Sequence, residues 1–209
     1  MLTTNNLQYQ YPDGASFQFP NLTCADNSQW LVLGPSGSGK STFLHLLAAL
    51  LRPSAGELLL DGTSYGHLSA RAGDQFRGKN IGMIFQRSYF VASLTVAENL
   101  DLAQRLAGQP VDKQGNRQLL EELGIGQHAD RFPQHISIGE QQRASIARGL
   151  VNQPKLLLAD EPTAALDAKN TAIVSRLLRE RAEQLGAVLL VVTHDERLLK
   201  DFKNVVRMK

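Results

Sequence analysis

Short apolar runs alternate with longer stretches of helical character along most of the chain. Five runs are nearly continuous in apolar residues: WLVLG, ELLLD, IGMIF, LLLAD and VLLVVT, at 30–34, 57–61, 81–85, 156–160 and 188–193. Apolar runs of this kind are typical of strands that are buried on both faces of a mainly parallel sheet. The spacing between them leaves room for helical crossovers, which predicts an α/β fold.

Two early segments predict further elements. STFLHLLAALLRP, at 41–53, is apolar almost all round and ends at Pro53, so we expect a helix buried under the sheet. LQYQYPDGASFQF, at 7–19, has alternating apolar residues on both sides of a Pro-Asp-Gly turn. This second pattern predicts a small antiparallel hairpin or edge element.

The region from about 87 to 150 lacks strand-like runs. It contains amphipathic stretches such as VAENLDLAQRLAG and VDKQGNRQLLEELG, which favour helices. We therefore expect a single domain over 1–209. Within it, an α/β core would cover about 1–86 and 151–209, and a helical subdomain would be inserted at about 87–150.

Composition excludes several classes of protein. The net charge is +2 with no run of Lys or Arg, so we expect no nucleic-acid partner. Cys24 is the only cysteine, which rules out an internal disulfide and fits a reducing compartment. The first residues do not resemble a signal peptide, and the apolar runs are far shorter than the roughly 20 residues that cross a bilayer. We expect a protein that is soluble or held to a membrane by something else.

The stretch LGPSGSGKST, which includes the end of the first apolar run, fits the pattern G-x-x-x-x-G-K-S of a phosphate-binding loop (P-loop). Glycines let backbone N–H groups close around an anion, and the following helix points its N-terminus at the same place. The lysine is expected to reach the β- and γ-phosphates and the next serine to ligate Mg²⁺. A Gly/Ser-rich turn that binds nothing would not call for that lysine. The predicted loop residues are Gly34, Pro35, Ser36, Gly37, Ser38, Gly39, Lys40, Ser41 and Thr42.

Two acids end the fourth apolar run, in LLLADEPTAALD. Asp160 would lie at the carboxyl edge of the sheet, where ligands gather in open α/β folds, and is suited to hold the water shell of a metal ion near Ser41. Glu161 follows at once and is placed to orient a water for attack on the γ-phosphate. The alternative is an acidic cap on the next turn.

A third motif, ISIGEQQRASIARGL, begins a helix. Ser137 is a suitable N-cap, Glu140 follows three residues later as in a capping box, and Gly139 allows close backbone approach. These residues make a second helix start that suits an anion, although the residues alone favour the interpretation of a simple capped helix.

Together the three motifs make the chain similar to the ATP-binding cassette (ABC) ATPases, whose signature is commonly written LSGGQ or LSGGE and is followed by Gln-Arg. The resemblance covers almost all of the chain, with the motifs in the family's order. It implies a P-loop NTPase core with a mainly parallel sheet, an N-terminal antiparallel β element and an inserted α-helical subdomain. ATP and Mg²⁺ are the implied cofactors, and the activity is ATP hydrolysis coupled to transport.

The resemblance also assigns roles within the nucleotide site. Tyr11 matches the aromatic residue that stacks on adenine, although the nearby Tyr9 is an alternative. Gln86 resembles the glutamine that reaches the metal and the attacking water and senses the membrane partner, and His194 matches the histidine that contacts the γ-phosphate. The implied catalytic residues are Glu161, His194 and Gln86, and the implied metal ligands are Ser41, Gln86 and Asp160.

Other residues are implied to act across a dimer interface. Ser137 and Gly139 match signature residues that bind the γ-phosphate of the partner's ATP, with Glu140 beside them, and Asp167 matches the aspartate of the loop that crosses the interface. Ile136 replaces the usual leucine, and Ile138 stands where the signature has its first glycine. We expect a working composite site, with altered closure or turnover because Ile138 is bulky and β-branched.

The implied partners follow from the single loop and single signature. A complete site needs a second copy or a related cassette, in an ATP-dependent dimer. Integral membrane permease subunits would hold the protein on the cytoplasmic face of the inner (plasma) membrane. The chain looks most like the small cassettes of the lipoprotein-releasing, macrolide-exporting and cell-division permeases, and an uptake system remains open. The alternative is a cassette ATPase that acts on ribosomes or DNA.

Overall fold

The computed structural model describes residues 1–164 and 166–208, without the side chains of 168 and 169. The main elements in chain order are β1 (Leu2–Gln10), β2 (Ser16–Gln18), β3 (Leu22–Cys24), β4 (Gln29–Leu33), α1 (Lys40–Leu47), β5 (Ala55–Leu60), β6 (Thr63–Ser64), α2 (Ala70–Asn80), β7 (Ile81–Ile84), α3 (Val96–Leu106), α4 (Lys113–Glu122), α5 (Ile138–Leu150), β8 (Leu156–Asp160), α6 (Ala168–Gln184), β9 (Val188–Thr193) and β10 (Asn204–Arg207). Short 3-10 helices are η1 (Gly126–His128), η2 (Pro133–His135) and η3 (Glu196–Asp201).

A parallel sheet forms the centre of the molecule, with strand order β10-β4-β9-β8-β7. Every residue of β8 and β9 is buried, as expected for strands covered on both faces. Because the strands are parallel, the ends of β4, β8 and β9 meet at one edge of the sheet. The P-loop and the Asp-Glu pair therefore come together there.

A second, antiparallel sheet contains the N-terminal strands. β1 pairs with β2, β3 and β5, and β5 pairs with β6. The predicted hairpin is present as β1 and β2. The ELLLD run was wrongly predicted to belong to the parallel sheet: it ends β5 in this antiparallel sheet. Leu58 and Leu60 are buried and Leu59 is only partly so, which is the alternation of a strand with one covered face.

Helix α1 joins the two sheets. Its Phe43, Leu44 and Leu46 are fully buried in one cluster with Leu2 and Leu58 of the antiparallel sheet and with apolar residues of β4, β8 and β9. The helix was predicted over 41–53 but ends at Leu47. The chain turns before the proline is reached, because Ala49 adopts a left-handed backbone with φ of 53°.

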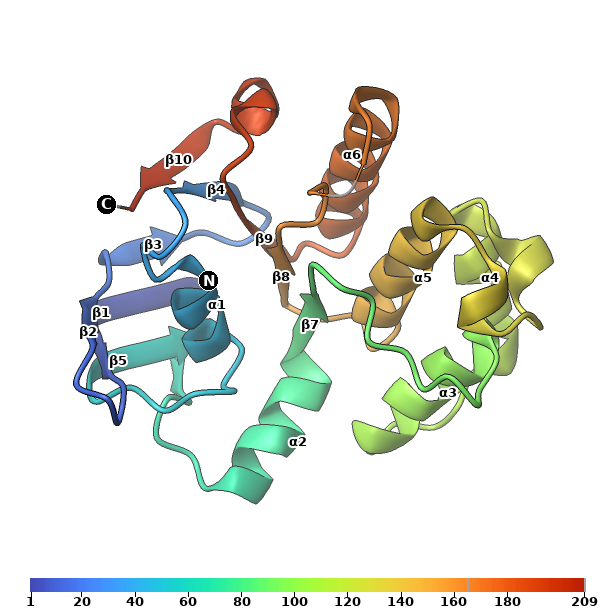
Figure 1. The fold of residues 1–209 in the computed structure, drawn as a ribbon. Coiled ribbons are helices and arrows are strands. Elements are labelled where there is room, and N and C mark those ends of the chain that lie inside the picture. The colour runs from blue at the N-terminus through green and yellow to red at the C-terminus, as the bar shows by residue number, and fades with distance from the viewer. Residues whose placement is uncertain (165, 209) are drawn as a thin grey trace.

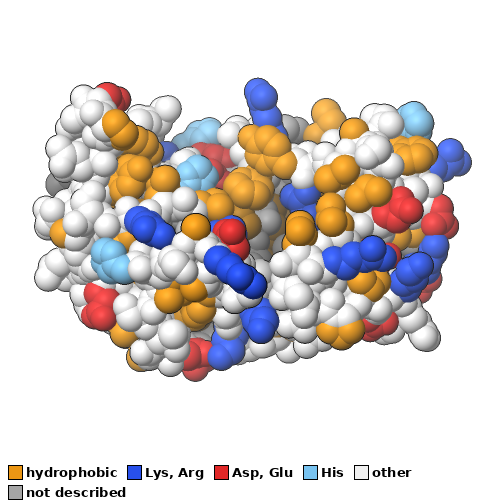
Figure 2. Space-filling view, turned by 90° about the horizontal axis from the view of Figure 1, so that it is seen from below, with side chains coloured by type: hydrophobic (Ala, Val, Ile, Leu, Met, Phe, Trp, Pro, Cys, Tyr) orange, Lys and Arg blue, Asp and Glu red, His pale blue; other side chains and the backbone are white. Residues whose placement is uncertain are grey.

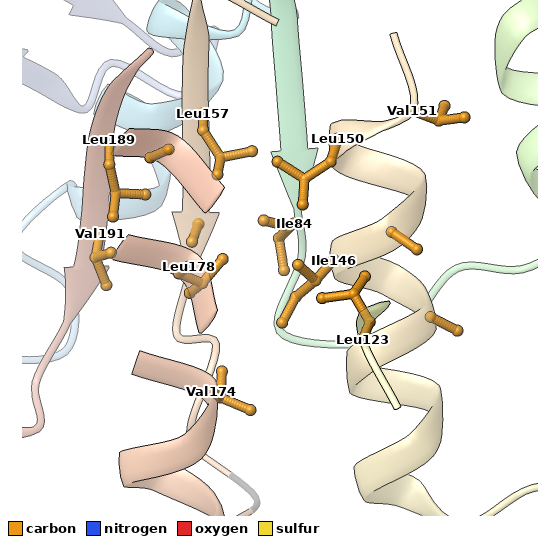
Figure 3. Close-up of a cluster of buried hydrophobic side chains, with 14 of the residues drawn as sticks. Ile84, Leu123, Ile146, Leu150, Val151, Leu157, Val174, Leu178, Leu189 and Val191 are labelled. Carbon is orange, nitrogen blue, oxygen red and sulfur yellow. The ribbon is translucent and has the colours of Figure 1, made fainter. Parts of the chain in front are cut away.

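A second cluster covers the other face of the parallel sheet. Side chains from β7, β8 and β9 point towards α5 and α6, with Ile84 and Leu157 facing Ile146 and Leu150 (Figure 3). Figure 1 shows α3, α4 and α5 gathered on one side of the molecule, away from β1 and β5. The two amphipathic stretches predicted as helices are α3 and α4.

The surface has a mixed character. On the face shown in Figure 2, lysine and arginine side chains are scattered among apolar and polar ones. Over the described residues, every helix is too short or too polar to cross a membrane.

Candidate active site

A cavity of about 720 Å³ opens at the carboxyl edge of the parallel sheet. Predicted residues from four separate segments of the chain line it, together with aromatic residues of the N-terminal hairpin. The lining residues are Tyr11, Phe17, Pro35, Ser36, Gly37, Gly39, Lys40, Ser41, Thr42, Gln86, Glu161 and His194. The structure thus brings the P-loop, the glutamine after β7, the acid after β8 and the histidine after β9 into one site.

The P-loop conformation depends on its glycines. Gly37 and Gly39 have φ of 83° and 84°, which L-residues rarely adopt. A Cβ atom at Gly39 would also lie 2.6 Å from Cδ1 of Phe17. Lys40, the first residue of α1, is buried and donates hydrogen bonds of 2.8 Å from Nζ to the carbonyls of Gly34 and Pro35. The ammonium group is therefore held against the loop.

Asp160 ends β8 beside the start of α1. Its Oδ1 lies 3.5 Å from Oγ of Ser41, in a long hydrogen bond. Burial raises the pKa of the Asp160 carboxyl, and the hydrogen bond from Ser41 opposes this. Over the described residues, no group of three or more His, Cys, Asp or Glu side chains is placed to hold a metal ion by itself. A hydroxyl and one carboxylate fit Mg²⁺, which usually completes its shell with water and phosphate oxygens.

Glu161 is held by the end of β9. Its Oε2 accepts a hydrogen bond of 2.7 Å from Oγ1 of Thr193. Its Oε1 lies 2.7 Å from Nδ1 of His194 and accepts a 3.1 Å bond from the backbone N of the same residue. The backbone of Glu161 has a φ of 46°, a strained value for a residue other than glycine. These contacts fix the carboxylate at the cavity wall.

Aromatic residues form the outer wall of the cavity. The hydroxyl of Tyr11 lies 2.8 Å from Oγ1 of Thr42, which attaches the hairpin to α1. Tyr9 packs edge-on against Tyr11, with ring centroids 4.7 Å apart, and is not among the lining residues. Phe17 does line the cavity, although it was not among the predicted site residues. Its register opposite Tyr9 in the hairpin was the available signal.

The signature residues lie elsewhere. Ser137 caps α5 in a capping box with Glu140, as predicted from the motif. Neither these two residues nor Gly139 lines the cavity. Ile138 is 67% exposed in the first turn of α5. Asp167 is the exposed N-cap of α6 and accepts a 2.8 Å hydrogen bond from the backbone N of Asn170.

A parallel sheet with a P-loop after β4 and an Asp-Glu pair after β8 defines a P-loop nucleoside triphosphatase. Residues 17–164 match the family model described as ABC transporter. The lipoprotein-releasing system ATP-binding protein LolD of Shewanella denitrificans is 38% identical over 215 residues, covering 100% of this chain and 92% of that protein. LolD of Shewanella oneidensis is 40% identical over 191 residues, covering 90% and 83%.

Solved structures that are similar to this chain are also ATP-binding cassettes. The ATP-binding cassette MJ0796, in a dimeric post-hydrolysis state bound to ADP and Pi, aligns with a TM-score of 0.90 at 30% identity, covering 100% of this chain and 94% of that one. The cbiO1 protein of Clostridium perfringens, part of the ABC transporter complex cbiONQ, aligns with a TM-score of 0.88 at 29% identity, covering 100% and 84%.

The chain belongs to the ABC transporter family, as an ATP-binding and ATP-hydrolysing subunit. The predictions of family, fold class and ATPase activity are confirmed. The relatives are transport proteins by name, which favours the transport prediction over the alternative of an ATPase acting on ribosomes or DNA.

Proposed function

We propose that two copies of this chain, or this chain and a related cassette, close head to tail around ATP. Each nucleotide would lie between the P-loop of one chain and the signature of the other. This proposal rests on the positions of the motifs in the single chain. The P-loop, Gln86, Glu161 and His194 line the cavity, whereas Ser137 and Gly139 lie outside it. A second chain is the simplest source of the missing signature.

Within the site, the roles follow from position and chemistry. Lys40 would supply positive charge to the β- and γ-phosphates, and Tyr11 would stack on adenine. Ser41 and Asp160 would hold Mg²⁺, with Gln86 as a further ligand. When bound, the metal would neutralise charge that develops on the phosphates during transfer.

Glu161 would act as the general base. Its carboxylate is anchored by Thr193 and His194 on the cavity wall, so an oxygen is placed to accept a proton as water attacks the γ-phosphate. His194 is largely exposed and would add a contact to the γ-phosphate. Asp167, at the start of α6, would cross to the second chain.

The transport partner would be a separate membrane permease. The identities to LolD support the lipoprotein-releasing group of systems, with the cassette held on the cytoplasmic face of the inner membrane. We propose that the helical unit at about 87–150, inserted in a core of about 1–86 and 151–209, carries the signature as one subdomain. Gln86 lies where core and helical unit join and would report the permease to the site.

The mass of the protein with and without ATP tests the proposed dimer. Glu161→Gln protein should have the 22.9 kDa mass of one chain without nucleotide and twice that mass with ATP and Mg²⁺, measured by light scattering. Glu161→Gln with Ser137→Arg is the matched control, because it keeps the P-loop and blocks the signature with a bulky side chain. It should stay at the mass of one chain. A parent variant that stays monomeric with saturating ATP would contradict the proposal.

A further inference from the structure

Glu140, in the signature, is held from two sides. Its Oε2 accepts hydrogen bonds of 2.8 Å from the backbone N and 2.7 Å from Oγ of Ser137. Its Oε1 lies 2.9 Å from Nε2 of His128, the last residue of η1. The side chains of His128 and Glu140 are 25% and 22% exposed. His128 therefore reaches the signature turn through Glu140.

The directions of these hydrogen bonds follow from the charge on Glu140. The hydrogen bonds from the Ser137 side chain and backbone lower the pKa of the Glu140 carboxyl, with a smaller effect from His128. An ionised carboxylate only accepts hydrogen bonds. Nε2 of His128 and Oγ of Ser137 are therefore both donors. Ser137 has a single hydroxyl proton, which it donates to Glu140.

This arrangement conflicts with the role of Ser137 in a composite site. To bind the γ-phosphate of a second chain, the hydroxyl must turn its proton away from Oε2 and towards a phosphate oxygen. The carboxylate of Glu140 would meanwhile repel that phosphate. A hydrogen-bond donor at Oε1 weakens both the bond from Ser137 and the repulsion of the phosphate, because it draws the negative charge of the carboxylate towards Oε1.

We propose that His128 is a positioning residue of the signature. By donating a hydrogen bond to Oε1 of Glu140, it releases the hydroxyl of Ser137 to the γ-phosphate held by the second chain. This inference rests on the composite site proposed above, and it gives that site a residue outside the signature motif.

The other charged groups described here near η1 are either paired with another residue or negative. Asp130, two residues further on, is paired with Arg117 of α4 at 2.6 Å and 3.1 Å. From the same helix, Glu121 lies against Gly126 at the start of η1. The cation of Arg117 is thus engaged by another acid, and Glu121 adds negative charge on that side. Among the described residues, His128 is the hydrogen-bond partner of Oε1 of Glu140.

Variants in a Glu161→Gln background test the inference by titrating dimer formation with ATP. His128→Ala should raise the ATP concentration at half-dimerisation about fivefold, the scale of one side-chain hydrogen bond. His128→Arg keeps a hydrogen-bond donor for Oε1 of Glu140 and should restore closure. ATP binding to the single chain, measured with a fluorescent analogue at low protein concentration, should be the same in all three proteins.

A double variant separates positioning from a merely structural tether. Glu140→Gln removes the charge that His128 is proposed to compensate. Adding His128→Ala to this variant should therefore change the ATP concentration at half-dimerisation by less than twofold, which is the usual error in adding the effects of independent sites. If the parent dimerises and His128→Ala closes at the same ATP concentration, the inference fails and the composite site stands. If His128→Ala is equally harmful with and without Glu140→Gln, the inference also fails. A parent that does not dimerise would overturn both proposals.

Discussion

Glu161→Gln is expected to lower the rate of ATP hydrolysis by about 10²–10⁴-fold, the usual contribution of a general base. Glutamine keeps the size of the side chain and can still bond Thr193, so the cavity wall is retained. The amide cannot accept a proton from the attacking water. ATP should therefore bind and drive dimerisation normally while phosphate release nearly stops.

Asp160→Asn is the matched control for this prediction, since the neighbouring acid is changed in the same way. The Asp160 carboxylate bonds Ser41, whereas the Glu161 carboxylate bonds Thr193 and His194, so the loss of Asp160 should act through the metal. We expect weaker Mg²⁺-dependent ATP binding in Asp160→Asn and unchanged binding in Glu161→Gln. Near-normal phosphate release by Glu161→Gln would remove Glu161 from the role of base.

Lys40→Ala is expected to abolish ATP hydrolysis to the limit of detection. The loss of the ammonium leaves the β- and γ-phosphates without their main positive side chain, although the backbone of the P-loop remains. Within the described part of the chain, the hydrogen bonds of Nζ go to carbonyls of the loop itself, at Gly34 and Pro35, so the fold should survive. The measurement is phosphate release beside a circular dichroism melt.

Lys155→Ala provides the control for Lys40→Ala. It also removes a lysine, but its ammonium pairs with Asp61 and does not line the cavity. Its hydrolysis should be close to that of the unaltered protein. A folded Lys40→Ala variant with unchanged turnover would contradict the assignment of the P-loop.

The fold could be predicted where burial alone decides it. Strands β4, β7, β8 and β9 are covered on both faces, so each appears as an apolar run. The ELLLD run was misassigned, because a run of three leucines hides the alternation that its pairing with β1 imposes. The early end of α1 also escaped prediction, because the left-handed turn at Ala49 carries no glycine.

Some residues of the site could be predicted from the sequence and others could not. Lys40, Ser41, Asp160 and Glu161 lie in contiguous motifs whose spacing carries the chemistry, so sequence reasoning could propose them. Supporting residues act through tertiary contacts instead. Thr193 touches Glu161 from 32 positions away. His128 likewise owes its position to η1, where no local pattern marks it, and Phe17 owes its position to its place opposite Tyr9 in the hairpin.

In the proposed dimer, the P-loop of one chain faces the signature of the other. Ser36 and Ile138 are both exposed and suit single cysteine replacements. The natural Cys24 will not interfere, because it is fully buried and burial raises the pKa of its thiol to about 12. Two proteins are needed, Ser36→Cys and Ile138→Cys, each with Glu161→Gln.

Cross-linking of these two proteins with a short bis-maleimide is the most direct measurement. The mixture should give a covalent dimer only when ATP and Mg²⁺ are present, and each protein alone should give little, because a head-to-tail arrangement pairs unlike positions. Mixing without ATP controls for random collision. A mixture that stays unlinked with ATP, or cross-links that join only like positions, would contradict the composite site.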